Sequence, residues 1–216
     1  FAAKHAECVF IVESRETLKG RANVITDIRN QATRLGRNPE DILFIQGVSP
    51  VVGGTEAEAK AKEAEYLEQF STEGSLAHLS GSVGGDLGAI NLDEPLQKID
   101  SQSMRGFVKS LIESTPDKTQ TFRDLIRTRI SGQFLTGAPE QIADALQRWH
   151  GLGVDGFNIV YSITPGTFVD FIDSVVPILQ SRGLMQKEYT PGPLRQKIFG
   201  NAKLPARHPA AAYRRG

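Results

Sequence analysis

Cysteine is nearly absent from the 216 residues: Cys8, set in an apolar run, is the single example. One thiol excludes a disulfide framework and a metal cluster held by cysteines. We expect Cys8 to be a buried, unreactive thiol in a reducing compartment. Apolar runs also stay short of the ~18 residues that a membrane-spanning helix requires, and no secretory signal pattern opens the chain. The sequence therefore predicts no membrane segment and a cytoplasmic location.

Net charge is absent as well. The 25 Lys and Arg residues balance 25 Asp and Glu residues, and no basic stretch is interleaved with aromatic residues, so we expect no nucleic-acid partner. The dense carboxylates of residues 56–68 indicate a solvated helix face. The 4 histidines lie far apart, without carboxylates at ligand spacing, which predicts no metal site.

Three apolar runs have the length of strands buried on both faces of a parallel sheet. They are Cys8–Val12, Ile42–Val48 (or on to Val52) and Phe157–Tyr161. Capping and periodicity predict helices between and after them: Ser14 to Gly36, the Thr55–Glu58 capping box to Phe70, Ser103–Ile112, Phe122–Ile130, Pro139 through Trp149, and Thr164 to Gly183. In the last helix we expect a bend at Pro177 and an inward face of Phe168, Phe171, Ile172, Val175 and Leu179.

Strands that alternate with helices predict right-handed strand–helix–strand units in an α/β fold. No Gly-x-Gly-x-x-Gly follows any of these strands and no Walker motif occurs, so we expect three wedges of a TIM (β/α)8 barrel instead of a nucleotide-binding domain. Such a barrel needs ~250 residues, so about half of it would lie upstream of Phe1 and the chain would be a fragment. The expected organisation is a barrel portion, 1–183, with an insertion at 71–135, and a C-terminal extension, 184–216.

The active face of such a barrel lies at the carboxyl ends of the strands. In this chain those ends are Glu13–Arg15, Ser49–Thr55 and Tyr161–Thr164. The position of Tyr161 makes it a candidate for lining the pocket.

The stretch Ser71–Leu87 carries His78 and then Gly81-Ser82-Val83-Gly84-Gly85, a composition that predicts a loop. One interpretation is a surface connection in which His78 merely finds a hydrogen-bond partner. The other is a lid over an active site, with His78 as a hydrogen-bond donor or proton-transfer group. The insertion follows the helix after the second strand, so we expect it to fold back over the active face.

Motifs along the whole chain carry a resemblance. They are Phe1–Glu7, Leu76–His78 with its glycine-rich continuation, Asp155–Asn158, Pro165–Phe171, Leu194–Gly200, Leu204–Pro205 and Tyr213–Arg214. Together they resemble the C-terminal half of the flavin-dependent monooxygenases of the bacterial luciferase-like superfamily. The branch is the one that contains nitrilotriacetate monooxygenase component A, dibenzothiophene-sulfone monooxygenase and long-chain alkane monooxygenase.

The resemblance implies that this chain holds strands six, seven and eight of the barrel, with the insertion between strand seven and its main helix. It implies an oxygenase that takes reduced FMN from a separate NAD(P)H:FMN reductase, reacts it with O2 to a flavin hydroperoxide and inserts one oxygen atom into an organic substrate. The family's active-site histidine falls on His78, and Tyr161 is a candidate FMN contact. The FMN-phosphate site is expected upstream of Phe1, so the chain alone is expected neither to bind FMN nor to turn over.

Two alternatives remain open from the sequence. One is a deazaflavin-dependent oxidoreductase of the same superfamily, which the long insertion and basic tail disfavour. The other is a non-catalytic half-barrel for binding or assembly, which the exposed strand edges disfavour. The substrate stays open among aminopolycarboxylates, sulfones, sulfonates and long alkanes. The tail and family habit indicate a homo-oligomer, either a dimer or a tetramer.

Overall fold

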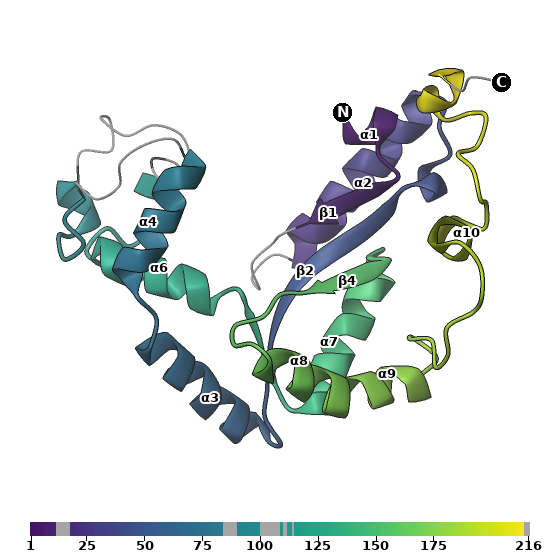
Figure 1. The fold of residues 1–216 in the computed structure, drawn as a ribbon. Coiled ribbons are helices and arrows are strands. Elements are labelled where there is room, and N and C mark those ends of the chain that lie inside the picture. Colours follow the sequence, from purple (N-terminus) through teal and green to yellow (C-terminus); the bar gives the residue numbers. More distant parts are fainter. Residues whose placement is uncertain (12–17, 84–89, 100–108, 110–111, 114, 214–216) are drawn as a thin grey trace. The chain divides into compact units, whose positions relative to one another are not determined.

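The computed structural model describes residues 1–11, 18–83, 90–99, 109, 112–113 and 115–213 (Figure 1). The chain forms two compact units, the first made of Phe1–Lys62 with Gln133–Gly216 and the second of Glu63–Gly132. Helix α3 (Glu56–Glu68) begins in the first unit and ends in the second. Within the described residues, every helix is too short or too polar to cross a membrane.

A parallel sheet forms the centre of the first unit. The described residues contribute β1 (Cys8–Ile11), β2 (Leu43–Val52), β3 (Phe134–Gly137) and β4 (Gly156–Ile159). The first part of β2 pairs with β1 and β4 and its last part pairs with β3, all in parallel. The predicted α/β fold with a parallel sheet is confirmed. Strand β3 was not predicted, because its sequence, Phe-Leu-Thr-Gly, has only two consecutive apolar residues and so contains no apolar run.

One face of the sheet is covered by helices. Phe44 and Val48 on β2 are at most 2% exposed, and they share a core with Ile142 and Leu146 of α7 (Pro139–Gly151). The intervening residues of β2 are partly exposed up to Ser49. This alternation arises because successive side chains of a strand point to opposite faces.

Local signals set the predicted starts of α3 and α7 and the predicted end of the first long helix, whose predicted start at Ser14 lies outside the described residues. At the start of α3, Thr55 Oγ1 accepts the Glu58 N–H at 3.2 Å and the Glu58 carboxylate accepts the Thr55 N–H at 3.1 Å. Pro139 is the first residue of α7. Gly36, which follows α2 (Leu18–Arg34), has a φ of +75°, in the left-handed region where glycine is favoured. The remaining short helices before β2 are α1 (Ala2–His5) and η1 (Pro39–Asp41).

The helical region after β4 is not one regular helix. It consists of α8 (Gly166–Asp170), the π-helical η3 (Phe171–Val175) and α9 (Val176–Ser181). Pro177 has no N–H to donate, and the wide π turn lies directly before it. Phe171 is buried as predicted, whereas Ile172 is 56% exposed, so its predicted inward position is wrong. A turn with an extra residue changes which side chains share a helix face.

The second unit has its own small core. Besides the end of α3, its described residues form the helices α4 (Thr72–Val83), η2 (Leu96–Lys98) and α6 (Phe122–Ser131). The buried residues that they share with neighbouring segments are Leu76, Leu96, Ile112, Phe122, Leu125 and Ile126. The predicted helix over Phe122–Ile130 is confirmed. The predicted helix Ser103–Ile112 lies mostly outside the described residues.

The glycine-rich stretch after Ser71 is helical where it is described. The prediction of a loop is wrong for α4, and the positions after Val83 up to Leu87 lie outside the described residues. The Ser71 hydroxyl accepts the Gly74 N–H at 2.9 Å, as a helix N-cap does. Leu76 is 5% exposed in the core of the second unit. Burial of that side chain and the cap offset the glycine's unfavourable helix propensity.

The C-terminal segment, with α10 (Leu194–Phe199) and η4 (Pro209–Tyr213), is fixed to the first unit by two arginines. Arg195 donates twice to Glu7, at 2.7 and 2.6 Å, and Arg207 donates twice to Asp41, at 2.7 and 2.6 Å. The hydrogen bonds from Arg195 lower the pKa of Glu7, and those from Arg207 lower the pKa of Asp41. Both carboxylates precede strands, so the segment lies against the amino edge of the sheet.

Candidate functional site

The carboxyl ends of the strands lie at one edge of the sheet, because all pairings are parallel. Two of the three segments expected at an active face lie at this edge. Ser49–Thr55 is the end of β2 with the turn into α3, and Tyr161–Thr164 follows β4. The third segment, Glu13–Arg15, lies outside the described residues.

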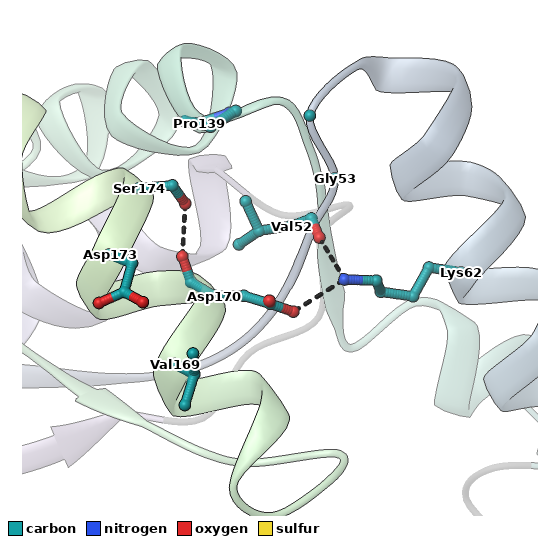
Figure 2. A pocket seen from close by; sticks show the side chains of 9 residues that line it. Val52, Gly53, Lys62, Pro139, Val169, Asp170, Asp173 and Ser174 are labelled. Atoms are coloured by element: carbon teal, nitrogen blue, oxygen red, sulfur yellow. Dashed lines mark hydrogen bonds and ion pairs between the residues drawn. The ribbon is translucent and has the colours of Figure 1, made fainter.

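A cavity of about 230 Å³ opens at this edge (Figure 2). Its walls come from the turn after β2, the start of α7, the helices after β4, and one side chain of α3. The lining residues are Val52, Gly53, Gly54, Lys62, Pro139, Val169, Asp170, Asp173 and Ser174. Apolar side chains and convergent polar groups together are typical of small-molecule sites.

Lys62 is the cationic group of the cavity. Figure 2 shows its Nζ directed at two acceptors: the Val52 carbonyl oxygen at 2.9 Å and Asp170 Oδ2 at 2.8 Å. The side chains of this ion pair are only 32% and 35% exposed. The Ser174 hydroxyl donates to the main-chain carbonyl of Asp170. These contacts join the end of β2, α3 and the α8–η3 helices.

Local sequence brings Lys62 to this position. A Cβ at Gly53 would lie 2.3 Å from the Ala59 nitrogen, so glycine is needed for α3 to approach the end of β2 this closely. The capping box of Thr55 and Glu58 then sets the start of the helix. Lys62 follows Glu58 by four residues and therefore lies on the same helix face.

Tyr161 lies at the same edge and is 60% exposed. Its ring centroid is 5.9 Å from that of Phe168 on α8. Thr167, the residue before Phe168, is 3% exposed. Its hydroxyl oxygen accepts hydrogen bonds from the N–H groups of Ser162 and Ile163, at 3.1 and 3.2 Å. Helix α8 therefore shapes the Tyr161–Ile163 segment on one side and carries Asp170 on the other.

His78 lies in the second unit, on α4, with an exposed side chain. An ion-pair cluster in the same unit joins α4 to α6: Arg123 Nη1 is 2.9 Å from Glu73, and Arg123 Nε is 2.8 Å from Asp93. The hydrogen bonds from Arg123 lower the pKa of Asp93. The functional roles of His78 and Tyr161 stay predictions.

Sequence reasoning missed Lys62 and Asp170. Lys62 lies on the helix that follows β2, and Asp170 lies on the helix that follows β4, so both come after the carboxyl end of a strand, where an active face was expected. Helix composition alone, however, marks Lys62 only as one of several surface charges. The predicted solvated face of residues 56–68 is wrong at Glu63, which is 9% exposed and accepts the Ser131 hydroxyl at 2.9 Å. The helix buries that carboxylate in the second unit beside a donor.

Fold and cavity together define a class: a parallel α/β protein whose candidate site lies where the strands end. The chain belongs to the Luciferase-like monooxygenase family, whose model matches residues 1–156. The predicted membership of a luciferase-like family is confirmed.

Similar proteins cover this chain almost completely. It is 40% identical over 220 residues to dimethyl-sulfide monooxygenase of Hyphomicrobium sulfonivorans, and the alignment covers 99% of this chain and 45% of the relative. It is 38% identical over 221 residues to long-chain alkane monooxygenase of Geobacillus thermodenitrificans, again over 99% of this chain and 45% of the relative. A crystal structure from H. sulfonivorans superposes with a TM-score of 0.82 at 40% identity, over 99% of this chain and 46% of that one. The chain thus spans about half the length of these relatives.

The predicted branch is also confirmed. Besides long-chain alkane monooxygenase, both other named members match. Nitrilotriacetate monooxygenase component A of Aminobacter aminovorans is 33% identical over 91% of this chain, and dibenzothiophene-sulfone monooxygenase of Rhodococcus erythropolis is 30% identical over 92% of this chain. A solved riboflavin lyase with modified FMN, 27% identical, has a TM-score of 0.78 over 100% of this chain and 48% of that one.

The described cavity does not by itself fit a flavin mononucleotide. Its volume of about 230 Å³ is below the roughly 300–1,000 Å³ of clefts that bind drug-sized ligands and cofactors. The described residues of the carboxyl edge therefore supply at most part of such a site.

Proposed function

We propose that this chain is the C-terminal portion of the oxygenase component of a two-component monooxygenase. In this proposal, the protein uses reduced FMN from a separate NAD(P)H:FMN reductase and O2 to oxygenate a small organic substrate. The observation that carries the proposal is the match to dimethyl-sulfide monooxygenase, at 40% identity over 99% of this chain. The names of the other relatives, monooxygenases for alkanes, sulfones and nitrilotriacetate, support the same reaction type.

Within this proposal, β1, β2 and β4 correspond to strands six, seven and eight of a TIM barrel. The range 71–135 is then an insertion after strand seven, and 184–216 is a C-terminal extension. The parallel pairing in the order β1, β2, β4 supports this assignment, because consecutive barrel strands are neighbours. The FMN-phosphate site belongs to residues upstream of Phe1, which agrees with the small volume of the described cavity.

His78 is the proposed catalytic residue. An imidazole changes protonation near neutral pH, so it can donate a hydrogen bond or a proton to an oxygen atom during oxygen transfer. Tyr161 is proposed to line the flavin or substrate pocket, and its exposed ring at the carboxyl edge supports that role. The protein is proposed to act as a homodimer or homotetramer, and a monomer in light scattering at micromolar concentration would contradict this.

The proposed reaction is tested with the full polypeptide, a flavin reductase, NADH, FMN and ¹⁸O2. Dimethyl sulfide and a long-chain alkane serve as test substrates, because relatives carry those names. Mass spectrometry should find one ¹⁸O atom in the product. Without the reductase, no ¹⁸O-labelled product should form. Products labelled from H2¹⁸O instead of ¹⁸O2 would refute an oxygenase.

The role of His78 is tested by His78→Ala, with His5→Ala as the matched control. Both histidines are exposed and lie on helices, His5 on α1. Loss of a general acid or base typically costs about 10²- to 10⁴-fold, so we expect kcat to fall about 100-fold or more in His78→Ala and to stay unchanged in His5→Ala. Equal, small effects in both variants would reject the proposed role.

A further inference from the structure

The contacts at the carboxyl edge form a continuous series from Lys62 to Tyr161. Lys62 binds the Val52 carbonyl and Asp170 (Figure 2), so the last residue of β2 and helix α8 are held by one ammonium group. Helix α8 in turn holds the segment after β4 through Thr167 and Phe168.

We infer that Lys62 and Asp170 are positioning residues for Tyr161 and the segment that follows it. This inference rests on the proposed function in one respect, namely that Tyr161 contacts the flavin or the substrate. In this inference, the ion pair acts on Tyr161 through α8.

The geometry makes this pair suited to positioning. Both side chains are about two-thirds buried, at 32% and 35% exposure, and the Nζ–Oδ2 distance is 2.8 Å. A partly buried charged hydrogen bond is directional and exceeds a solvated surface pair in strength. Helix α8 lacks a side-chain cap at Pro165 and continues directly into the π-helical η3. The first turn of a helix has N–H groups without an intrahelical partner, so the position of this uncapped start depends on tertiary contacts.

The same helix α3 provides a matched control pair. Lys60 and Glu56 form an ion pair with side chains 67% and 51% exposed. That pair is spaced i to i+4 on the helix surface and reaches neither the cavity nor α8 among the contacts of the described residues. Lys60→Met therefore removes a lysine and an ion pair from α3 without affecting the proposed chain of contacts.

The first test is hydrogen–deuterium exchange of the full polypeptide. The N–H groups of Ser162 and Ile163 donate to Thr167 Oγ1, so their exchange reports how firmly α8 holds this segment. We expect Lys62→Met and Asp170→Asn each to speed exchange of these amides about five- to tenfold, an effect between that of an exposed ion pair and that of a hydrogen bond to a charged group. Lys60→Met should leave these amides unchanged, and Lys62→Arg should restore most of the protection.

The second test is steady-state kinetics, with whichever of the test substrates is oxygenated. Lys62→Met and Asp170→Asn should raise the KM for that substrate about five- to tenfold with a smaller change in kcat. The double variant should be no worse than either single variant, because both remove the same interaction.

Unchanged exchange at Ser162 and Ile163 in Lys62→Met and Asp170→Asn would overturn the inference. Acceleration of amides throughout the first unit, with KM unchanged, would also overturn it, because it would show general stabilisation only. If Lys62→Met does not fold, Asp170→Asn and Lys62→Arg decide the question by the same measurements. If the exchange result is as expected but no oxygenated product forms, the inference that Lys62 and Asp170 position Tyr161 stands and the proposed function fails.

Discussion

Replacing Gly53 with alanine should disturb the candidate site more than any neighbouring glycine substitution. The added Cβ would lie 2.3 Å from the Ala59 nitrogen and 2.8 Å from its Cα, where ordinary contacts begin at 3.4 Å. The start of α3 must therefore move by about 1.1 Å, the difference between 3.4 and 2.3 Å. Overpacking of this kind costs about 1–3 kcal/mol, and the upper part of that range applies because the obstacle is main chain and not a flexible side chain.

Thermal and urea denaturation measure this cost. A loss of about 2–3 kcal/mol corresponds to a fall in Tm of about 4–12 °C for a chain of this size. The displacement should also weaken the hydrogen bond between Lys62 and Val52, so exchange at Ser162 should rise. Two matched controls exist: a Cβ at Gly54 meets only the flexible end of the Glu58 side chain, and a Cβ at Gly151 meets nothing within 4 Å.

Gly54→Ala should therefore cost less than Gly53→Ala, and Gly151→Ala at the end of α7 should be neutral or stabilising by about 0.5–1 kcal/mol. A Gly53→Ala variant as stable as the parent, or less perturbed than Gly54→Ala, would refute the reasoning about the close approach of α3 to β2.

Three further changes have defined outcomes. The pKa values of Glu7 and Asp41 are lower in the folded state than in the unfolded state. Their stabilisation of the fold is therefore complete above the unfolded-state pKa values of about 4 and is lost as the pH falls through the folded-state values. Protease cleavage within 184–213 should thus rise below about pH 4, and a cleavage rate that stays constant down to about pH 2 contradicts this. Phe44→Ala should lose about 3–5 kcal/mol in chemical denaturation, since Phe44 is 0% exposed; a loss below about 1 kcal/mol would show that the core repacks. Thr167→Val leaves two N–H groups without their acceptor and should cost about 1–3 kcal/mol, a loss that Thr167→Ser should largely avoid in the same assay.

The sequence by itself determined the elements that depend on neighbouring residues. The apolar runs gave β1, β2 and β4, because β-branched and aromatic side chains favour strands. The predicted burial on both faces is wrong for β1, where Cys8 and Phe10 are exposed. The reciprocal cap of Thr55 and Glu58 and the proline at position 139 set the starts of α3 and α7, because these interactions span only a few residues. The order of strands and helices then implied the parallel sheet and the edge at which the candidate site lies.

Tertiary structure decided what local patterns leave open. The stretch after Ser71 has the composition of a loop, yet it is helical because Leu76 is buried in a core that only the folded second unit creates. Ile172 turned outward because a π turn, and not a regular helix, precedes Pro177. Lys62 and Asp170 are separated by 108 residues and meet at 2.8 Å. The periodicity of a helix shows which of its residues share a face, but it carries no information about which distant helix that face will contact. Only the tertiary structure, in which the strands place α3 and α8 at the same edge of the sheet, shows that Lys62 and Asp170 form a pair.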